Sequence, residues 1–473
     1  MTELPDYIKQ RTNKLLRSFG KGGHKPGSGS AAAFNGLLSC QLLLTVIKLS
    51  TKGGRIDTYK ESQEPLKEIR GFIEDIIYPK LIQLFQSDAE EFDKVIKLRD
   101  ERDVLIKSKS KTDSTFQALS ELENRLINSL KVATRIPIEI ANICSELAKY
   151  SLRVYDLGWK AVRGDTGVSI NSALSAIAGC NQIISLNLLS IPGNDPEAHK
   201  LVEDFRRIFE QYHQLEATAK SKLNQLYTEL DINYSFQKFL NKNQLKSDEY
   251  KSLKEEDIES LAYSILNQLW KNRNGLWKKD IPNNEIKIIN TKKVLKSLGF
   301  SHYSEHSLGV DLRNGSAEIG GIINKELKIV LTSEHRGKAV QNFTLAHELG
   351  HALLHTDMVL HRDIPLHGDK IRSTKEPKER QADLFAVYFL MPKNQVIKVF
   401  EELFGASQIR KKQLIPYDQD NRNFNKDLKY YSLILASLTS FKDMSSRETM
   451  AKVFNVSKEA MAYRLIKLKL IID

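Results

Sequence analysis

The chain has 473 residues, of which 41% are hydrophobic and 27% are charged. This length predicts two to four domains, each able to bury a full core without disulfides. The net charge of +12 at pH 7 is spread along the chain with acidic residues beside the basic ones. That distribution does not favour a nucleic-acid-binding protein.

The first residues and the cysteines indicate a reduced, cytoplasmic protein. Met1 to Asp6 lack the charged-then-apolar pattern of a secretion signal, and the richest apolar stretch, residues 36–47, is too short to cross a membrane. Cys40, Cys144 and Cys180 lie among apolar residues and form no metal-ligand pair. We therefore expect no membrane segment, and we interpret residues 36–47 as part of a core helix.

A segment rich in small residues precedes the first long predicted helix, which runs to about Leu49. The segment consists of Pro26, Gly27, Ser28, Gly29 and Ser30. A serine is available to cap this helix, and such a segment presents backbone N–H groups that suit an anion or a closely approaching ligand. The alternative is a glycine-containing linker before a capped helix.

Three predicted helical segments follow in order: Ser87 to Asp93, residues 133–141, and residues 164–167 leading to 187–189. Together with the glycine segment, this ordered set resembles the family of formiminotransferase-cyclodeaminases and methenyltetrahydrofolate cyclohydrolases over roughly residues 5–215. The resemblance implies an all-helical bundle that forms a homodimer or a higher even oligomer. It also implies a folate-like ligand in a pocket lined by residues 26–30 and Asp88.

The first half departs from this family in two places. The glycine segment has fewer glycines than is usual, and Ile170-Asn171 stands where an acidic residue is expected. Asp88 also has an alternative interpretation as a solvated acid within an acidic run. We therefore expect residues 1–215 to form a ligand-binding, dimeric scaffold.

The polar stretch 216–254 predicts a helical and flexible linker. It contains one small group of apolar residues, Phe236, Phe239 and Leu240. Helical spacing resumes near Ile258, so a second domain is expected over residues 255–410. Within it, residues 320–323 and 327–331 flank a short turn and predict a β-hairpin. We expect an edge strand there, to which an extended peptide can add.

The sequence His347-Glu348-Leu349-Gly350-His351 lies in a predicted helix that is apolar almost all round. Histidines four residues apart share one helix face and can bind one zinc ion, while Glu348 can act as general base on a water. The alternative is an amphipathic helix with unrelated polar residues. Because these side chains would be buried, a metal explains them better.

Zinc in a catalytic site needs a third protein ligand. A helix predicted from Pro377 and stopped by Pro392 places Glu379 and Asp383 on one face. We expect Glu379 to bind the metal and Asp383 to accept the outer N–H of a liganding histidine. His355 is expected to support the ligands or the fold, and His355 and Tyr388 are candidates for stabilising the oxyanion.

Residues 343–355, 379–386 and 390–392 resemble the ImmA/IrrE family of intracellular zinc metallopeptidases, and the resemblance extends over residues 255–473. It includes Met450 to Leu468, two short helices around the Val456-Ser457 turn. The resemblance implies His347, His351 and Glu379 as zinc ligands, Glu348 as catalytic carboxylate, and a protein substrate such as a helix-turn-helix repressor. Residues 411–473 are expected to be a helical segment with helix-turn-helix rhythm, acting as a structural cap or substrate-docking element rather than on DNA.

The predicted fold is mainly α, with a cyclodeaminase-like helical bundle followed by an α+β zincin-like domain with a small β-sheet and a terminal helical pair. The predicted function is that of an intracellular zinc endopeptidase that cleaves a regulatory protein under control of the first domain. A role in stress response or phage defence fits the resemblance. Two alternatives stay open: a folate cyclodeaminase or cyclohydrolase with an accessory protease, and a non-enzymatic regulatory or DNA-associated protein.

Overall fold

The computed structural model describes residues 11–22, 26–107, 113–193, 195–245, 252–277, 280–311, 317–335, 337–356, 359–362, 377–418, 427–439 and 448–473. The chain divides into two compact units, Met1–Leu226 and Tyr227–Asp473.

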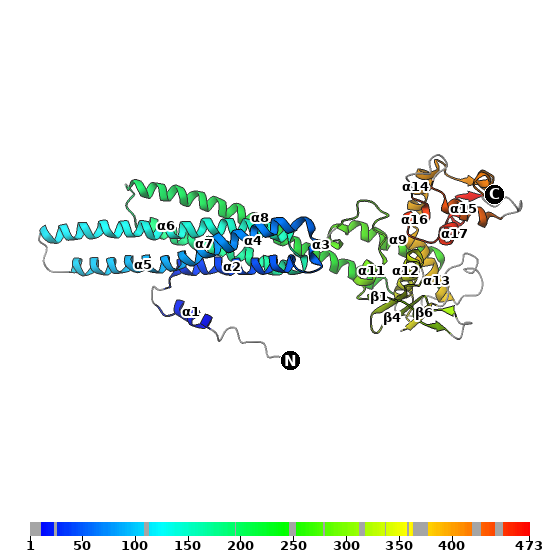
Figure 1. The fold of residues 1–473 in the computed structure, drawn as a ribbon, viewed down its shortest axis with the longest axis horizontal. Helices are drawn as coiled ribbons and strands as arrows, with labels where there is room; N and C mark the ends of the chain where they lie inside the picture. The colour runs from blue at the N-terminus through cyan, green and yellow to red at the C-terminus, as the bar shows by residue number, and fades with distance from the viewer. Residues whose placement is uncertain are drawn as a thin grey trace. The chain divides into compact units, whose positions relative to one another are not determined.

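The first unit is built from helices (Figure 1). They are α1 (Arg11–Phe19), α2 (Ser28–Ser50), α3 (Arg55–Thr58), η2 (Lys60–Ser62), α4 (Gln63–Phe72), η3 (Ile73–Ile77), α5 (Tyr78–Lys107), α6 (Asp113–Leu157), η4 (Lys160–Val162), α7 (Arg163–Leu188) and α8 (Pro196–Lys242).

The core of the first unit follows from helical spacing in α6. Its buried apolar residues recur every three or four positions, as at Ile140, Cys144 and Leu147, so one stripe faces the neighbouring helices. Helices α2 and α6 approach closely at Gly36, where a Cβ would lie 2.8 Å from Cys144 Sγ. The three cysteines are buried and form no disulfide.

Helix α2 is long and apolar enough to cross a membrane by length and composition alone. Among the described residues it is the one such helix, and 56% of its most apolar stretch is buried. Its buried residues, Leu43 and Ile47 among them, belong to the core shared with α6 and α7. This packing supports its interpretation as a core helix.

Helix α8 contributes to the cores of both units. Leu215 and Ala219 are buried in the core of the first unit, whereas Phe236 and Leu240 are buried in that of the second. Residues 216–242, predicted as part of a linker, continue this helix without a break.

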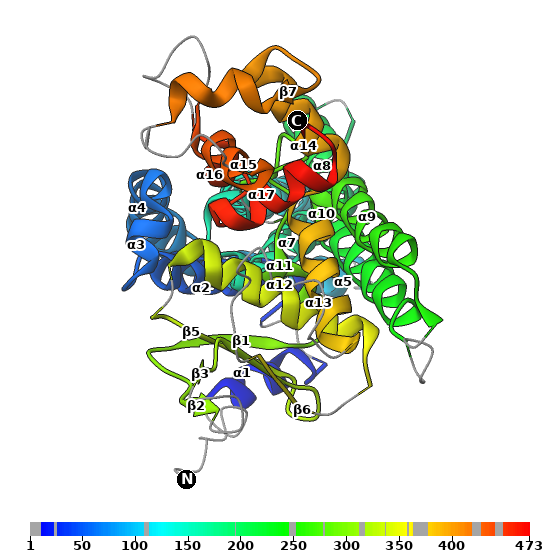
Figure 2. The same ribbon diagram turned by 90° about the vertical axis from the view of Figure 1, so that its right-hand side faces the viewer.

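The second unit combines helices with a small sheet (Figure 2). Its helices are α9 (Glu255–Lys271), α10 (Arg273–Leu276), α11 (Thr291–Ser297), α12 (Lys338–Leu354), α13 (Pro377–Leu390), α14 (Lys393–Phe404), η7 (Lys411–Tyr417), α15 (Leu428–Ser437), α16 (Met450–Val453) and α17 (Lys458–Lys467). Its strands are β1 (Ser301–Glu305), β2 (Val310–Asp311), β3 (Ala317–Glu318), β4 (Gly321–Asn324), β5 (Ile329–Ser333), β6 (Val359–Arg362), β7 (Ile409–Arg410) and β8 (Ile471–Ile472).

The main sheet has the strand order β1-β5-β4-β6, in which β1 and β5 are parallel and the other neighbours are antiparallel. Strands β4 and β5 form the predicted hairpin. The expectation that this hairpin supplies an edge strand is wrong, because β1 covers one of its strands and β6 covers the other. The described edges of this sheet are therefore β1 and β6.

Figure 2 shows α12 and α13 between the sheet and the C-terminal helices. The predicted C-terminal pair is present as α16 and α17, and Ser457 caps α17 by accepting a hydrogen bond from Ala460 N. The predicted fold class is confirmed: a helical first part is followed by an α+β part with a small sheet and a terminal helical pair.

Candidate metal centre

Two histidines of α12 face the same point inside the second unit. His347 and His351 are four residues apart on a helix whose residues 343–354 are all buried. Their Nε2 atoms are 2.9 Å apart, and both side chains are at most 1% exposed. The helix therefore brings two nitrogen donors together in an environment shielded from water.

Helix α13 brings a carboxylate to the same point. Glu379 Oε2 lies 3.1 Å from His347 Nε2, and Glu379 Oε1 lies 3.2 Å from His351 Nε2. One donor atom from each of these three residues can be chosen so that all lie within 4.8 Å of one another. Donor atoms in a tetrahedral zinc site are about 3.3 Å apart, given metal–nitrogen distances near 2 Å. The three side chains fit such an ion.

The outer nitrogen of each histidine is held by a second residue. Asp383 Oδ1 lies 2.9 Å from His347 Nδ1, so the carboxylate accepts the N–H there and leaves Nε2 with its lone pair. Asp383 is fully buried and lies one turn after Glu379 on α13. This is the relationship that the sequence predicts for Asp383.

His355 supports His351 through a relay that ends at Gln381. His351 Nδ1 lies 2.8 Å from His355 Nδ1, and His355 Nε2 lies 3.1 Å from Gln381 Oε1. The amide oxygen of Gln381 can only accept, so His355 carries its hydrogen on Nε2 and accepts the Nδ1–H of His351. His351 Nε2 is then unprotonated. Sequence reasoning missed Gln381, because a residue two positions after Glu379 lies about 200° round α13, away from the face that Glu379 and Asp383 share.

The electrostatics also suit a cation. Burial lowers the pKa of His351 to about 3, so this imidazole is neutral at pH 7 and its nitrogen can bind a metal. Burial by itself raises the pKa of Glu379, but hydrogen bonds and charge from His347 and His351 outweigh it and hold this pKa well below its ordinary range. The cluster thus offers a cation the neutral imidazole of His351 and the carboxylate anion of Glu379.

Glu348 lies beside this cluster and against the sheet. It directly follows His347 and is fully buried. Strand β4 approaches it at Gly321, where a Cβ would lie 2.8 Å from Glu348 Oε1 and 2.5 Å from Thr344 Cγ2. A side chain at position 321 would therefore displace the Glu348 carboxylate or Thr344 from its present position. The arrangement places a proton acceptor next to a candidate metal site, at the side of α12 that faces the sheet.

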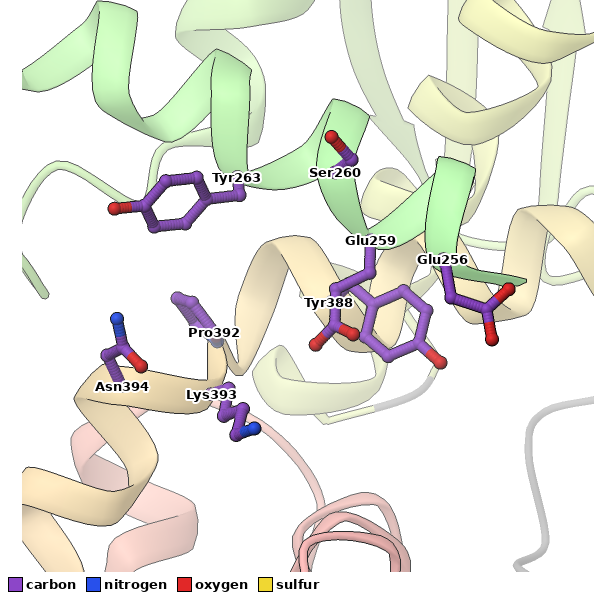
Figure 3. A pocket seen from close by; sticks show the side chains of 8 residues that line it. All are labelled: Glu256, Glu259, Ser260, Tyr263, Tyr388, Pro392, Lys393 and Asn394. Atoms are coloured by element: carbon purple, nitrogen blue, oxygen red, sulfur yellow. The ribbon is translucent and has the colours of Figure 1, made fainter. Parts of the chain in front are cut away.

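The expectation that Tyr388 stabilises an oxyanion at this centre is wrong. Tyr388 is nine residues after Glu379, about half a turn away around α13. Its hydroxyl contacts Glu255 and lies 2.6 Å from Lys467 Nζ. Tyr388 instead helps to line a cavity of about 320 Å³ between α9, α13 and α14 (Figure 3), together with Glu256, Glu259, Ser260, Tyr263, Pro392, Lys393 and Asn394.

The structure also joins the predicted residues of the first unit. Asp88 of α5 is 7% exposed and accepts hydrogen bonds from Ser30 N at 2.7 Å and from Ser30 Oγ at 3.0 Å. The interpretation of Asp88 as a solvated acid is therefore wrong. Burial raises the pKa of Asp88, although the bonds from Ser30 oppose that shift.

Asp88 takes the place of the predicted serine cap. The residue before α2 is Gly27, which makes no side-chain cap, whereas the Asp88 carboxylate accepts the third N–H of the helix. A Cβ at Gly29 would lie 2.0 Å from Asp88 Oδ1, so glycine is required at this close approach. Pro26 and Ser28 lie beside this contact in sequence.

Comparisons with known proteins match the two parts of the chain to two different families. Residues 11–207 match the family model described as formiminotransferase-cyclodeaminase, and residues 307–466 match the one described as IrrE N-terminal-like domain, a peptidase family. A solved formiminotetrahydrofolate cyclodeaminase from Thermotoga maritima is 18% identical, with a TM-score of 0.37, and the match covers 46% of this chain and 96% of that one. No curated protein matches the chain. The chain therefore joins a formiminotransferase-cyclodeaminase-like domain over residues 11–207 to an IrrE-like peptidase domain over residues 307–466.

Proposed function

We propose that this protein is a zinc-dependent endopeptidase whose metal is held by His347, His351 and Glu379. The observation that carries the proposal is the convergence of these three donors in a buried cluster with Glu348 beside it. Zinc bound there supplies a Lewis acid that polarises a peptide carbonyl and lowers the pKa of a water.

The residues of the chain then have distinct tasks. Glu348 accepts a proton from the attacking water and delivers it to the leaving amine. Asp383 and His355 keep the two imidazoles in the tautomer and orientation that direct Nε2 to the cluster. Gly321 leaves the space in which the Glu348 carboxylate lies.

The proposed substrate is a regulatory protein of the cytoplasm, with a helix-turn-helix repressor as the first candidate. The match to an IrrE-like domain supports this choice of substrate class. The C-terminal helices α16 and α17 fit a structural role, because buried Arg464 of α17 donates a hydrogen bond to Met391 O at the end of α13. That contact favours support of the peptidase over contact with DNA.

We further propose that the first domain forms a dimer or a higher even oligomer and controls the peptidase by binding a folate-like ligand. The match of residues 11–207 supports the ligand class, and the presence of both domains in one chain supports the coupling. A ligand shifts a conformational equilibrium only if it binds the two states differently. Cleavage that stays the same across saturating folate-type ligands would count against this control.

The alternative of an active folate cyclodeaminase rests on Asp88. Its carboxylate is engaged by Ser30 at the start of α2, which favours a role in shaping the glycine segment over proton transfer. Spectrophotometric turnover of a formimino- or methenylfolate that is lost in Asp88→Asn would favour the alternative.

The peptidase proposal is tested by comparing new protein N-termini in cells that express the wild type or Glu348→Gln. Cleavage products present with the wild type and absent with Glu348→Gln are expected. Glu326→Gln, an exposed glutamate in the hairpin turn, is the matched control and should keep them. Identical products from the wild type and Glu348→Gln would refute the proposal.

A further inference from the structure

The C-terminal end of α12 carries carbonyl groups that its own helix cannot satisfy. The last four carbonyls of an α-helix lack partners within the helix. Here the chain leaves Leu354 through His355 in an extended conformation, with φ −121° and ψ 158°, and no left-handed residue folds back over the end. The N–H of His355 donates a hydrogen bond to His351 O at 3.3 Å. The carbonyls that follow need donors from elsewhere.

Two of these donors come from the residues just after α8. Gln244 Nε2 donates to Ala352 O at 2.9 Å, and Leu245 N donates to Leu353 O at 3.0 Å. The side chain of Leu245 also packs against the core of the second unit. The end of α12 is thus held by a segment more than 100 residues earlier in the chain.

A third donor reinforces the same end. The ammonium group of Lys325, in the turn between β4 and β5, donates to His355 O. A positive charge at a helix C-terminus is favourable because the helix dipole is negative there. The last turn of α12 and the residue that follows it therefore receive hydrogen bonds from two separate segments.

This last turn carries the residues that orient one metal ligand. Ala352 directly follows His351, and His355 lies 2.8 Å from His351 through their Nδ1 atoms. Helix ends are the parts that fray first, whereas metal ligands must keep their positions to within about 0.5 Å. Loss of the external donors would loosen the turn that holds His351 and His355.

We propose that Gln244 and Leu245 are positioning residues of the metal centre, acting through the C-terminal end of α12. The inference rests on the proposed zinc site and extends it to a part of the chain outside the 307–466 match. It makes the segment that follows α8 a component of the peptidase.

The test measures the zinc dissociation constant of the full-length protein by competition with a chromogenic chelator. Gln244→Ala is expected to weaken zinc binding by up to about tenfold, the lower end of the loss seen when a direct partner of a metal ligand is removed, because Gln244 acts on His351 only through the helix end. Gln244→Lys should restore binding, because an ammonium can donate to Ala352 O and suits a helix C-terminus. Asn243→Ala is the matched control, since Asn243 donates to Phe239 O of its own helix at 2.8 Å, and it should bind zinc like the wild type.

Hydrogen exchange separates this inference from the proposed function. Amides of residues 351–355 should exchange faster in Gln244→Ala than in the wild type or Asn243→Ala. Equal zinc affinity in the wild type and Gln244→Ala overturns the inference. If the wild type binds no zinc, the proposed function fails, and equal exchange at residues 351–355 would then overturn the helix-end contact as well.

Discussion

Gly350 of α12 packs directly against Ala382 of α13. A Cβ at position 350 would lie 3.0 Å from Ala382 Cα and 3.2 Å from Ala382 O. Because the obstacle is backbone, it cannot rotate away as a side chain would. The glycine between His347 and His351 therefore sets the distance at which α13 presents Glu379, about one turn before Ala382.

Replacing Gly350 by alanine should push the two helices apart. We expect Gly350→Ala to lower the free energy of unfolding by about 1–3 kcal/mol, the usual cost of overpacking, and to weaken zinc binding. Chemical denaturation and chelator competition measure the two effects. Gly71→Ala is the control, because this helical glycine meets nothing closer than 3.9 Å, and it should be neutral or stabilising. Normal zinc affinity in Gly350→Ala would contradict the role given to this contact.

Asp383→Asn should weaken zinc binding without removing a ligand. The amide keeps an acceptor near His347 Nδ1 but loses the negative charge that stabilises the ring's orientation and basicity. We expect a zinc dissociation constant about 10-fold to 100-fold higher than that of the wild type. An unchanged constant would mean that His347 keeps its orientation without Asp383.

The metal-free protein should lose stability as the pH falls from 7 to 5. The pKa of His351 is about 3 in the folded protein, and an unfolded histidine has a pKa of about 6.5. The unfolded state therefore binds a proton in this interval that the folded state does not, so stability rises with pH and decreases on acidification. For this one group the loss is about 2 kcal/mol between pH 7 and pH 5.

Urea denaturation of the chelator-treated protein at the two pH values measures this difference. His351→Gln removes the titrating group and should reduce the pH dependence by a similar amount. The Glu379 carboxylate changes the stability at lower pH than His351 does. Its pKa in the folded protein is depressed, so the stability that it contributes is lost only as the pH falls below the ordinary carboxyl range. An equal pH dependence in His351→Gln and the wild type would show that His351 protonates while folded.

In the first unit, Gly29→Ala should separate α2 from α5. The added Cβ would lie 2.0 Å from Asp88 Oδ1, and moving Asp88 away breaks its bonds to Ser30. We expect the free energy of unfolding of this unit to decrease by about 2 kcal/mol or more. Gly164→Ala, a helical glycine with open space around it, is the control. Equal thermal stability of the two variants would contradict the close approach.

The parts of the metal centre that the sequence predicts are those set by spacing within one helix. His347 and His351, and likewise Glu379 and Asp383, are four residues apart, so each pair shares a helix face whatever surrounds it. The hairpin of β4 and β5 is also local. Burial of both helices then leaves few ways to arrange these polar groups.

The parts that sequence reasoning missed depend on segments distant along the chain. Gln381 of α13 meets His355, the residue that follows α12, although the two are 26 residues apart in sequence. Strand β6 pairs with β4 although α12 lies between them in the sequence. That pairing makes β4, which was predicted to lie at an edge, an interior strand. The contact of Asp88 with Ser30 spans 58 residues, and no local pattern reports such a distance.

Tyr388→Phe tests whether the far side of α13 takes part in the reaction. The Tyr388 hydroxyl lies among Glu255 and Lys467, and burial raises its pKa above the ordinary range, so it remains a neutral structural donor. Its removal should cost about 1 kcal/mol of stability and leave kcat and KM for a cleaved protein unchanged. Glu348→Gln should abolish kcat in the same assay with little loss of stability. A fall in kcat for Tyr388→Phe at unchanged KM would place its hydroxyl in the reaction, which requires α13 to turn by about half a rotation from the position that holds Glu379 against the two histidines.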